Sequence, residues 1–180
     1  MKKRILLIVL SVVTASSLSL TLLQNTHAAD LTAEQIGRIR ANCTSIMGSL
    51  NQLHASDALL RVNRGQIYET LGTKLMNNFN SRLSNNSLDN KGLVVVTNSY
   101  QTALAKFRTD YQTYEQQLSA AIRIDCTKSP SEFHASIELA REKRAIVRTS
   151  IVRLNQYIDD YRSAINDFML NFERVTGKGA

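Results

Sequence analysis

Two cysteines are the residues of this chain whose type and spacing best define a chemistry. Cys43 and Cys126 are the only cysteines among the 180 residues. In an exported chain such a lone pair predicts a disulfide, whereas in a reducing compartment it is two buried thiols. We expect the disulfide, and two buried thiols are the alternative.

Patterns typical of catalysis or metal binding are missing from the rest of the sequence. Past the N-terminal segment, His54 and His134 are the only histidines. His134 and Glu138 alone have the i,i+4 spacing of a helical metal site, and a metal site in a bundle needs several such ligands. The chain has no glycine-rich phosphate loop, no G-x-S-x-G turn and no C-x-x-C-H motif. We therefore expect no enzyme activity, no cofactor, and no catalytic or metal site.

Basic residues cluster towards the C-terminal end. The cluster consists of Arg141, Lys143, Arg144 and Arg148. Glu138 and Glu142 are interleaved with it, which favours a solvated face with internal salt bridges. The alternative is a surface that grips phosphate or an acidic polymer.

The net charge of the whole chain, +7, gives little support to nucleic-acid binding. Three of the positive charges fall in residues 2–4, so the chain from residue 29 onward has 19 Lys and Arg against 15 Asp and Glu, a net charge of +4. This surplus favours loose contact with anionic surfaces and weakens the case for nucleic acid as a partner. With 43% apolar and 21% charged residues, the composition fits one ordered domain.

The N-terminus has the parts of an export signal. Residues 2–4 are positively charged, and residues 5–23 form an apolar stretch that leads to a small-residue cleavage site. We expect cleavage after Ala28 or Ala29, which makes residues 1–28 a signal peptide. The alternative is an uncleaved anchor, because the apolar stretch exceeds the usual roughly 7 to 15 residues. Both interpretations predict export to the periplasm, the cell surface or the exterior.

The longest apolar pattern predicts a first helix over residues 32–85. Thr32 and Gln35 form a capping box at its start. Apolar residues then recur in steps of three and four, as in a coiled-coil seam. The predicted seam consists of Ile36, Ile39, Cys43, Ile46, Leu50, Leu53, Leu60, Ile67, Leu71, Leu75, Phe79 and Leu83. Three interior glycines are points at which this helix would bend or break, namely Gly48, Gly65 and Gly72.

Two further helices follow a loop of turn-forming residues at 84–90. Helix two is predicted over residues 91–126 and helix three over residues 130–175. Helix three starts sharply, because Ser129 suits the N-cap and Pro130 suits the first helical position. The inward-facing residues predicted for these helices are Leu93, Val96, Tyr100, Leu104, Phe107, Tyr111, Tyr114, Leu118 and Ala121, and Ile137, Ala140, Arg144, Val147, Ile151, Leu154, Ile158, Tyr161, Ile165, Phe168 and Phe172.

Long helices with short connections pack antiparallel, each beside the next. The sequence therefore predicts an all-α fold, in which an N-terminal signal helix precedes a three-helix, up-down-up, coiled-coil-like bundle. The bundle comprises residues 29–176, and residues 177–180 form a tail.

The cysteines set the register of the predicted bundle. If Cys43 and Cys126 lie level, residues of the first and third helices at equal height differ by about 87 in number in an up-down-up arrangement. This offset places Asp57 beside Arg144 and predicts a partly buried ion pair. The alternative is that Arg144 extends into solvent and Asp57 pairs with Arg61 at i+4.

The same register leaves residues 30–42 projecting past the second turn. Ile36 and Ile39 then lack partners within the chain, so they cover the end of the bundle, fray or contact another chain. Together with Arg141 and Arg148 they form a candidate interaction surface.

Three features together resemble uncharacterised exported helical-bundle proteins of bacteria. These features are the signal segment, a capped first helix with an early cysteine, and the turn at residues 126–133, CTKSPSEF, that contains the second cysteine. The resemblance implies the bundle and its disulfide, and brings no known activity with it.

The predicted function is that of a non-enzymatic structural or protein-interaction module at the cell envelope or outside the cell. Its expected partner is a protein, either another copy or an envelope component. The alternative is a periplasmic holdase-type chaperone that acts as an oligomer. No small-molecule substrate is evident, nucleic acid is not expected, and the membrane is contacted only through the N-terminal segment if that segment is uncleaved.

Overall fold

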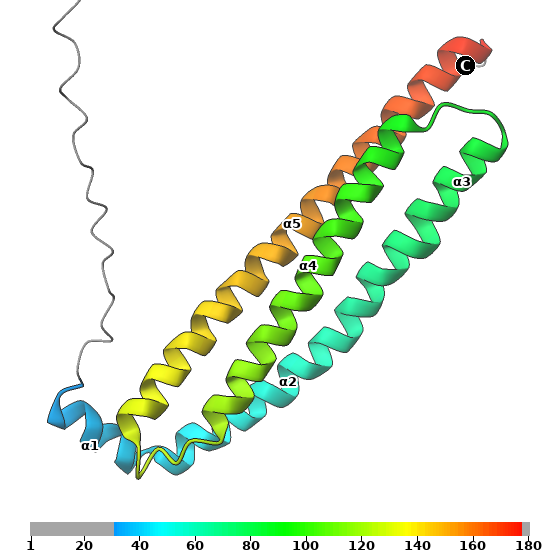
Figure 1. The fold of residues 1–180 in the computed structure, drawn as a ribbon. Helices are drawn as coiled ribbons and strands as arrows, with labels where there is room; N and C mark the ends of the chain where they lie inside the picture. The colour runs from blue at the N-terminus through cyan, green and yellow to red at the C-terminus, as the bar shows by residue number, and fades with distance from the viewer. Residues whose placement is uncertain (1–30, 178–180) are drawn as a thin grey trace, which may run out of the picture. The chain divides into compact units, whose positions relative to one another are not determined.

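The computed structural model describes residues 31–177, and over this range the chain is helical apart from short turns and contains no strand (Figure 1). The prediction of an all-α fold is confirmed. The predicted signal segment and residues 178–180 lie outside the described residues. The helices are α1 (Ala33–Ala41), α2 (Cys43–Thr70), the π-helix η1 (Leu71–Met76), α3 (Asn77–Asn85), α4 (Lys91–Ile122) and α5 (Pro130–Thr176).

Helices α2, η1 and α3 follow one another along a single rod (Figure 1). After the loop that follows α3, helix α4 returns beside this rod, and α5 runs beside α4. Helix α4 packs most extensively against α5 and less extensively against α2.

The predicted first helix, over residues 32–85, is interrupted in two places. Its start is as predicted, because Oγ1 of Thr32 accepts the N–H of Gln35 at 3.2 Å and Oε1 of Gln35 accepts the N–H of Thr32 at 2.8 Å. Helix α1 then ends at Asn42, whose φ of −104° and ψ of 8° leave the helical region. The side-chain amide of Asn42 donates to the carbonyl of Arg38 and competes with the helical hydrogen bonds there.

The second interruption is the π-helical segment η1. The buried positions around it follow in steps of four, at Tyr68, Gly72, Met76 and Asn80. In an α-helix each step of four turns the face by about 40° past a full turn, and the wider π turns absorb this drift. Of the three glycines expected to weaken the helix, only Gly72 lies in an irregular segment. Helix α2 passes through Gly48 and Gly65 without a break.

The face that α2 and η1 turn towards α4 differs from the predicted seam. Three predicted seam residues, Leu60, Ile67 and Leu75, are 48%, 57% and 56% exposed. Beside Ile67 and Leu75 the buried position is the next residue, Tyr68 and Met76, which rotates the face by about 100° there, whereas the residue after Leu60 is exposed. The seam prediction is therefore wrong for this part of the chain, and its apolar stripe lies on the surface.

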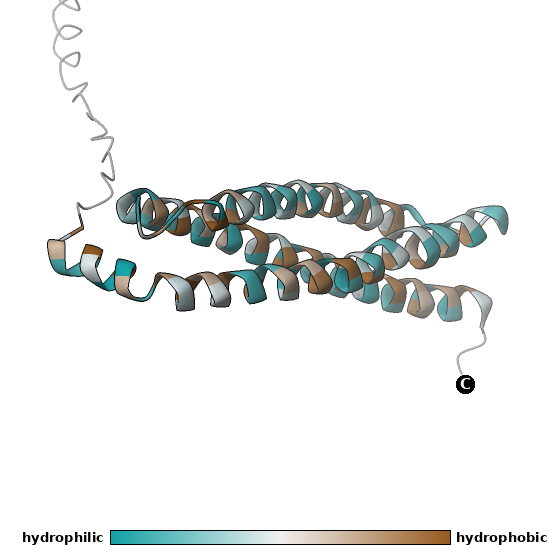
Figure 2. Ribbon diagram, turned by 90° about the horizontal axis from the view of Figure 1, so that it is seen from below, coloured by the Kyte–Doolittle hydropathy of each residue, from teal (hydrophilic) through white to brown (hydrophobic). Residues whose placement is uncertain are grey.

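The predicted inward faces of α4 and α5 are largely buried, and apolar residues recur between polar ones along each helix (Figure 2). Val96 is half-buried beside the fully buried Thr97, and Phe172 near the end of α5 is 42% exposed. The predicted residues that are fully buried are Leu93, Tyr100, Leu104, Phe107, Tyr111, Tyr114, Leu118, Ala121, Ala140, Val147, Leu154 and Tyr161.

The turn between α4 and α5 begins before residue 126, the predicted end of helix two. Oδ1 of Asp125 accepts the N–H groups of Lys128 and Thr127, at 3.2 and 2.9 Å, which favours a turn over a further helical turn. These hydrogen bonds hold the pKa of the Asp125 carboxyl below its usual value. Helix α5 begins at Pro130, as predicted, although the preceding serine makes no side-chain capping bond.

The disulfide between Cys43 and Cys126 is present as predicted, with the two Cα atoms 5.6 Å apart. It fastens the start of α2 to the α4–α5 turn, where Cys126 is fully buried. Beside it, Nε of Arg40 donates to the carbonyl of Thr127 at 3.2 Å. The α4–α5 turn is thus joined to α2 by a covalent bond and to α1 by a hydrogen bond.

Replacing both cysteines with serine is expected to lower the free energy of unfolding by about 4 kcal/mol, because the disulfide restricts a long loop of the unfolded chain. The two cysteines are 83 residues apart. Urea unfolding of the oxidised protein, the reduced protein and the double variant measures the effect. The reduced protein and the double variant should agree, and a loss below about 1 kcal/mol would contradict the prediction.

Gly72→Ala is expected to destabilise the protein by about 1 to 2 kcal/mol through overpacking. A Cβ at this position would lie 2.6 Å from Nε2 of Gln101 and 3.0 Å from Cε1 of the fully buried Tyr100. Gly48→Ala and Gly65→Ala are matched controls, because a Cβ there meets no atom within 4 Å. Each control should stabilise the helix by up to about 1 kcal/mol. Thermal denaturation tests the contrast, and equal stabilisation in all three variants would refute it.

Candidate interaction site

The arrangement of the helices leaves a cleft between α2 and α5. Both helices pack on α4, but their backbones scarcely approach each other. The cleft has a volume of about 430 Å³, and α4 forms its floor. It is lined by Asp57, Leu60, Arg61, Arg64, Phe107, Tyr111, Tyr114, Arg144, Val147, Arg148 and Ile151.

The structure brings Asp57 and Arg144 together in this cleft, as the register set by the cysteines predicts. Nε and Nη2 of Arg144 lie 3.2 Å from the two carboxylate oxygens of Asp57, which is 9% exposed. The hydroxyl of Tyr114 donates to the same carboxylate at 2.7 Å. Burial, and then the hydrogen bond to Asp57, raise the pKa of the Tyr114 hydroxyl well above its usual value, so it remains a donor. The alternative pairing with Arg61 is not formed, since that guanidinium lies over the ring of Tyr111, 5.3 Å from its centroid.

Three further arginines of the cleft have no acidic partner. Within residues 31–177, no carboxylate lies within 4 Å of a side-chain nitrogen of Arg61, Arg64 or Arg148. The carboxylate of Asp57 is the only acidic group in the lining, and Arg144 already neutralises it. Glu115, on the far side of Arg61, offsets part of its charge, so the cleft carries a surplus of about two to three positive charges, which attracts an anionic partner.

Apolar side chains accompany these charges. Leu60 and Ile151 stand on opposite walls, and Ile67 lies two helical turns after Leu60 on the same face of α2. A second hollow of about 360 Å³ lies further along the molecule, between η1, α3 and α5. Its lining is again apolar and basic, with no acidic residue, and consists of Lys74, Leu75, Asn78, Phe79, Arg82, Tyr161 and Ile165. We call the two hollows and the exposed stripe of Leu60, Ile67 and Leu75 the α2–α5 groove.

Most of the α2–α5 groove was not predicted from the sequence. Leu60, Ile67 and Leu75 were predicted to be buried in the seam, Arg61 was considered only as an alternative partner of Asp57, and Arg64 was given no role. Periodicity offered no signal for the groove, because an apolar stripe at helical spacing fits a buried seam equally well.

The residues proposed from sequence as an interaction surface do not form one patch. Arg148 lines the α2–α5 groove, but Arg141 pairs with Glu138. Ile36 and Ile39 lie in α1, and both are half-buried. Helix α1 contacts α5, which agrees with the expected outcome in which these residues cover the end of the bundle and not with the one in which they fray.

A polar cluster of His54, Glu115 and Ser119 has residue types found in hydrolases but not their geometry. Oε1 of Glu115 and Oγ of Ser119 both lie 3.2 Å from Nε2 of His54, and the serine hydroxyl donates to the same glutamate at 3.1 Å. A catalytic triad instead places the nucleophile and the carboxylate on different nitrogens of the imidazole. The hydrogen bond from His54 is the main cause that lowers the pKa of Glu115. The arrangement links α2 to α4 and activates no nucleophile.

His134 and Glu138 lie 3.8 Å apart, and in the part of the chain that the structure describes no group of three or more His, Cys, Asp or Glu residues comes close enough to hold a metal ion. No helix between residues 31 and 177 combines the length and the hydropathy that are needed to cross a membrane.

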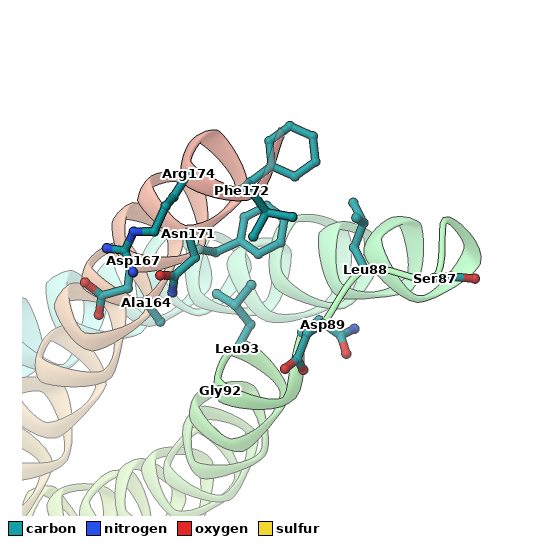
Figure 3. Close-up of a pocket in the computed structure, with 13 residues that line it drawn as sticks. Ser87, Leu88, Asp89, Gly92, Leu93, Ala164, Asp167, Asn171, Phe172 and Arg174 are labelled. Atoms are coloured by element: carbon teal, nitrogen blue, oxygen red, sulfur yellow. The ribbon is translucent and has the colours of Figure 1, made fainter. Parts of the chain in front are cut away.

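A further hollow, of about 620 Å³, lies between the α3–α4 loop and the end of α5 (Figure 3). Leu93 and Phe172 supply apolar surface to it. Its charged residues are of both signs, with Asp89 and Asp167 against Arg174. The charges nearly balance, so this hollow lacks the electrostatic preference of the α2–α5 groove.

The described residues thus define an all-helical, disulfide-linked chain with a basic groove that is lined by apolar side chains. Comparisons with protein-family models, with curated proteins and with solved structures found no match. The charge and the apolar lining of the α2–α5 groove are therefore the features of this chain that bear on its function.

A double-mutant cycle of Asp57→Asn and Arg144→Met is expected to show a coupling energy of about 1 kcal/mol, because the arginine side chain is still half exposed and solvent screens part of the attraction. Its side-chain exposure is 50%, against 11% for Asp57. Urea unfolding of the two single variants and the double variant gives the coupling. Strictly additive effects would show that the pair contributes nothing beyond its separate contacts.

Proposed function

We propose that this chain is a non-enzymatic protein-interaction module that is exported to the cell envelope or the exterior, and that the α2–α5 groove is its binding surface. The architecture that we infer for it is a three-helix antiparallel, up-down-up bundle. In this arrangement α4 holds the first rod and α5 apart at a fixed spacing, as a binding groove requires.

The observation that carries the proposal is the apolar stripe on α2 and η1. Leu60, Ile67 and Leu75 are each about half exposed, in line along one face of a long rod. Single exposed apolar residues are ordinary, whereas several that recur along one face with polar residues beside them are typical of a protein–protein contact. Unpaired arginines at its edge add the residue type that is enriched in such contacts.

Export is supported by two independent features of the chain. The signal-like sequence of residues 1–28 has the charged start and apolar stretch of a secretory segment, cleaved or retained as an anchor. The disulfide between Cys43 and Cys126 is of a kind that persists in oxidising compartments and is rare in the cytosol.

Site-specific photo-cross-linking tests the proposal. Benzoylphenylalanine is introduced at Ile67 or Leu75 in the groove, or at Val95 on the exposed face of α4 as the matched control, since Val95 is 64% exposed. In cells that export the protein, the groove positions should yield discrete cross-linked products that the control position lacks. Indiscriminate products from all three positions would overturn the proposal and favour a holdase-type chaperone. No product from the groove positions would overturn it as well.

A further inference from the structure

Resting on this proposed function, we further propose that the occupant of the α2–α5 groove is an amphipathic α-helix of a partner protein, with acidic residues flanking its apolar face. The groove combines an apolar stripe with unpaired cations, and such a helix complements both. Charge, spacing and the shape of the groove each support this class of partner.

The charge of the groove selects an acidic occupant. Arg61, Arg64 and Arg148 have no carboxylate within 4 Å among residues 31–177, and Lys74 and Arg82 extend the positive lining along η1 and α3. Asp57 cannot offset them, because it is buried and engaged by an arginine and a tyrosine. Carboxylates of a bound helix would form charge-assisted hydrogen bonds with these guanidinium groups.

The spacing of the apolar residues selects a helix. Leu60, Ile67, Leu71 and Leu75 recur at intervals of one and two helical turns on the first rod. Ile151, Ile158 and Ile165 recur every two turns on α5 and are half-buried. Two rows with this period form ridges, and the side chains of a helix from a partner protein fit into the space between them. The span from residue 60 to residue 79 is about 30 Å, which calls for an occupant of roughly 20 residues.

Two other occupants fit the groove less well. A second copy that docked groove to groove would place arginine opposite arginine, which is unfavourable in a symmetric contact. A bilayer presents a flat anionic surface, whereas these cations line a cleft between two helices over the aromatic floor of Phe107 and Tyr111. Both alternatives become outcomes of the experiment.

The experiment uses the full, oxidised protein and three synthetic helical peptides of about 20 residues. The first has leucines at helical spacing flanked by glutamates, the second has lysines in place of the glutamates, and the third is a scrambled form of the first. Fluorescence anisotropy should show that the acidic amphipathic peptide binds at least about tenfold more tightly than either control. Its affinity should fall as salt rises from about 0.05 to about 0.5 M.

Variants locate the binding. Arg64→Glu with Arg148→Glu should weaken binding of the acidic peptide at least about tenfold. The matched control, Arg38→Glu with Arg162→Glu, changes the net charge equally, but its residues form only exposed surface pairs outside the groove. The affinity of this control variant for the acidic peptide should stay within about twofold of that of the unmodified protein. Arg64→Gln with Arg148→Gln, which avoids charge reversal, should give an intermediate loss.

Three outcomes overturn the inference. In the first, the acidic and lysine peptides bind equally, or neither binds. In the second, sedimentation shows a dimer that the acidic peptide does not dissociate. In the third, the Arg64→Glu, Arg148→Glu variant loses binding to vesicles that contain phosphatidylglycerol but keeps its affinity for the acidic peptide. If cross-links from Ile67 and Leu75 persist while the peptides fail, the groove remains the interaction surface and only the acidic helix is wrong. If the cross-links are absent too, both proposals fall.

Discussion

The rest of the structure depends on the aromatic face of α4 and on what its hydroxyl groups require. Tyr100 and Tyr114 are almost fully buried, and a buried hydroxyl without a partner costs free energy that packing does not recover. Tyr100 donates to the carbonyl of Tyr68 at 2.7 Å, and Tyr114 donates to Asp57 at the same distance. Both partners belong to α2. The tyrosines therefore select the face of α2 that turns inward, and close packing at Gly72 keeps that face against α4.

This requirement explains why sequence reasoning succeeded on α4 and α5 and failed on α2. On α4 and α5 the apolar stripe and the buried face coincide, so periodicity alone finds the core. The cysteine register also places Asp57 beside Arg144, because a covalent link fixes relative height without reference to either face. Along α2, η1 and α3 the apolar residues and the hydrogen-bond acceptors lie on adjacent faces. Periodicity counts only the former, whereas the structure buries Asp57 and Asn80 to satisfy tyrosines of α4 and α5.

The π-helical segment shows the same limit of sequence reasoning. Tyr161 of α5 donates to Oδ1 of Asn80 at 2.9 Å and to the carbonyl of Met76 at 3.2 Å, and burial raises its pKa to about 12. Tyr68 and Asn80 must therefore face the other helices together, although twelve residues of regular α-helix would rotate them about 120° apart. The π turns of η1 correct that rotation. A glycine in the sequence indicates that a helix can deform, but it does not give the direction, which here comes from partners far along the chain.

The groove follows from these constraints together with the charges on its walls. Turning the tyrosine acceptors inward leaves Leu60, Ile67 and Leu75 at the surface, and apolar walls alone would favour closing α2 onto α5. Closure would bring Arg61 and Arg64 towards Arg148 with no further carboxylate to separate them, and the repulsion between like charges grows as water is excluded. Asp57 offsets the charge of one arginine only. The groove therefore combines apolar walls with a surplus of positive charge, and the occupant that we propose would bury the former and neutralise the latter.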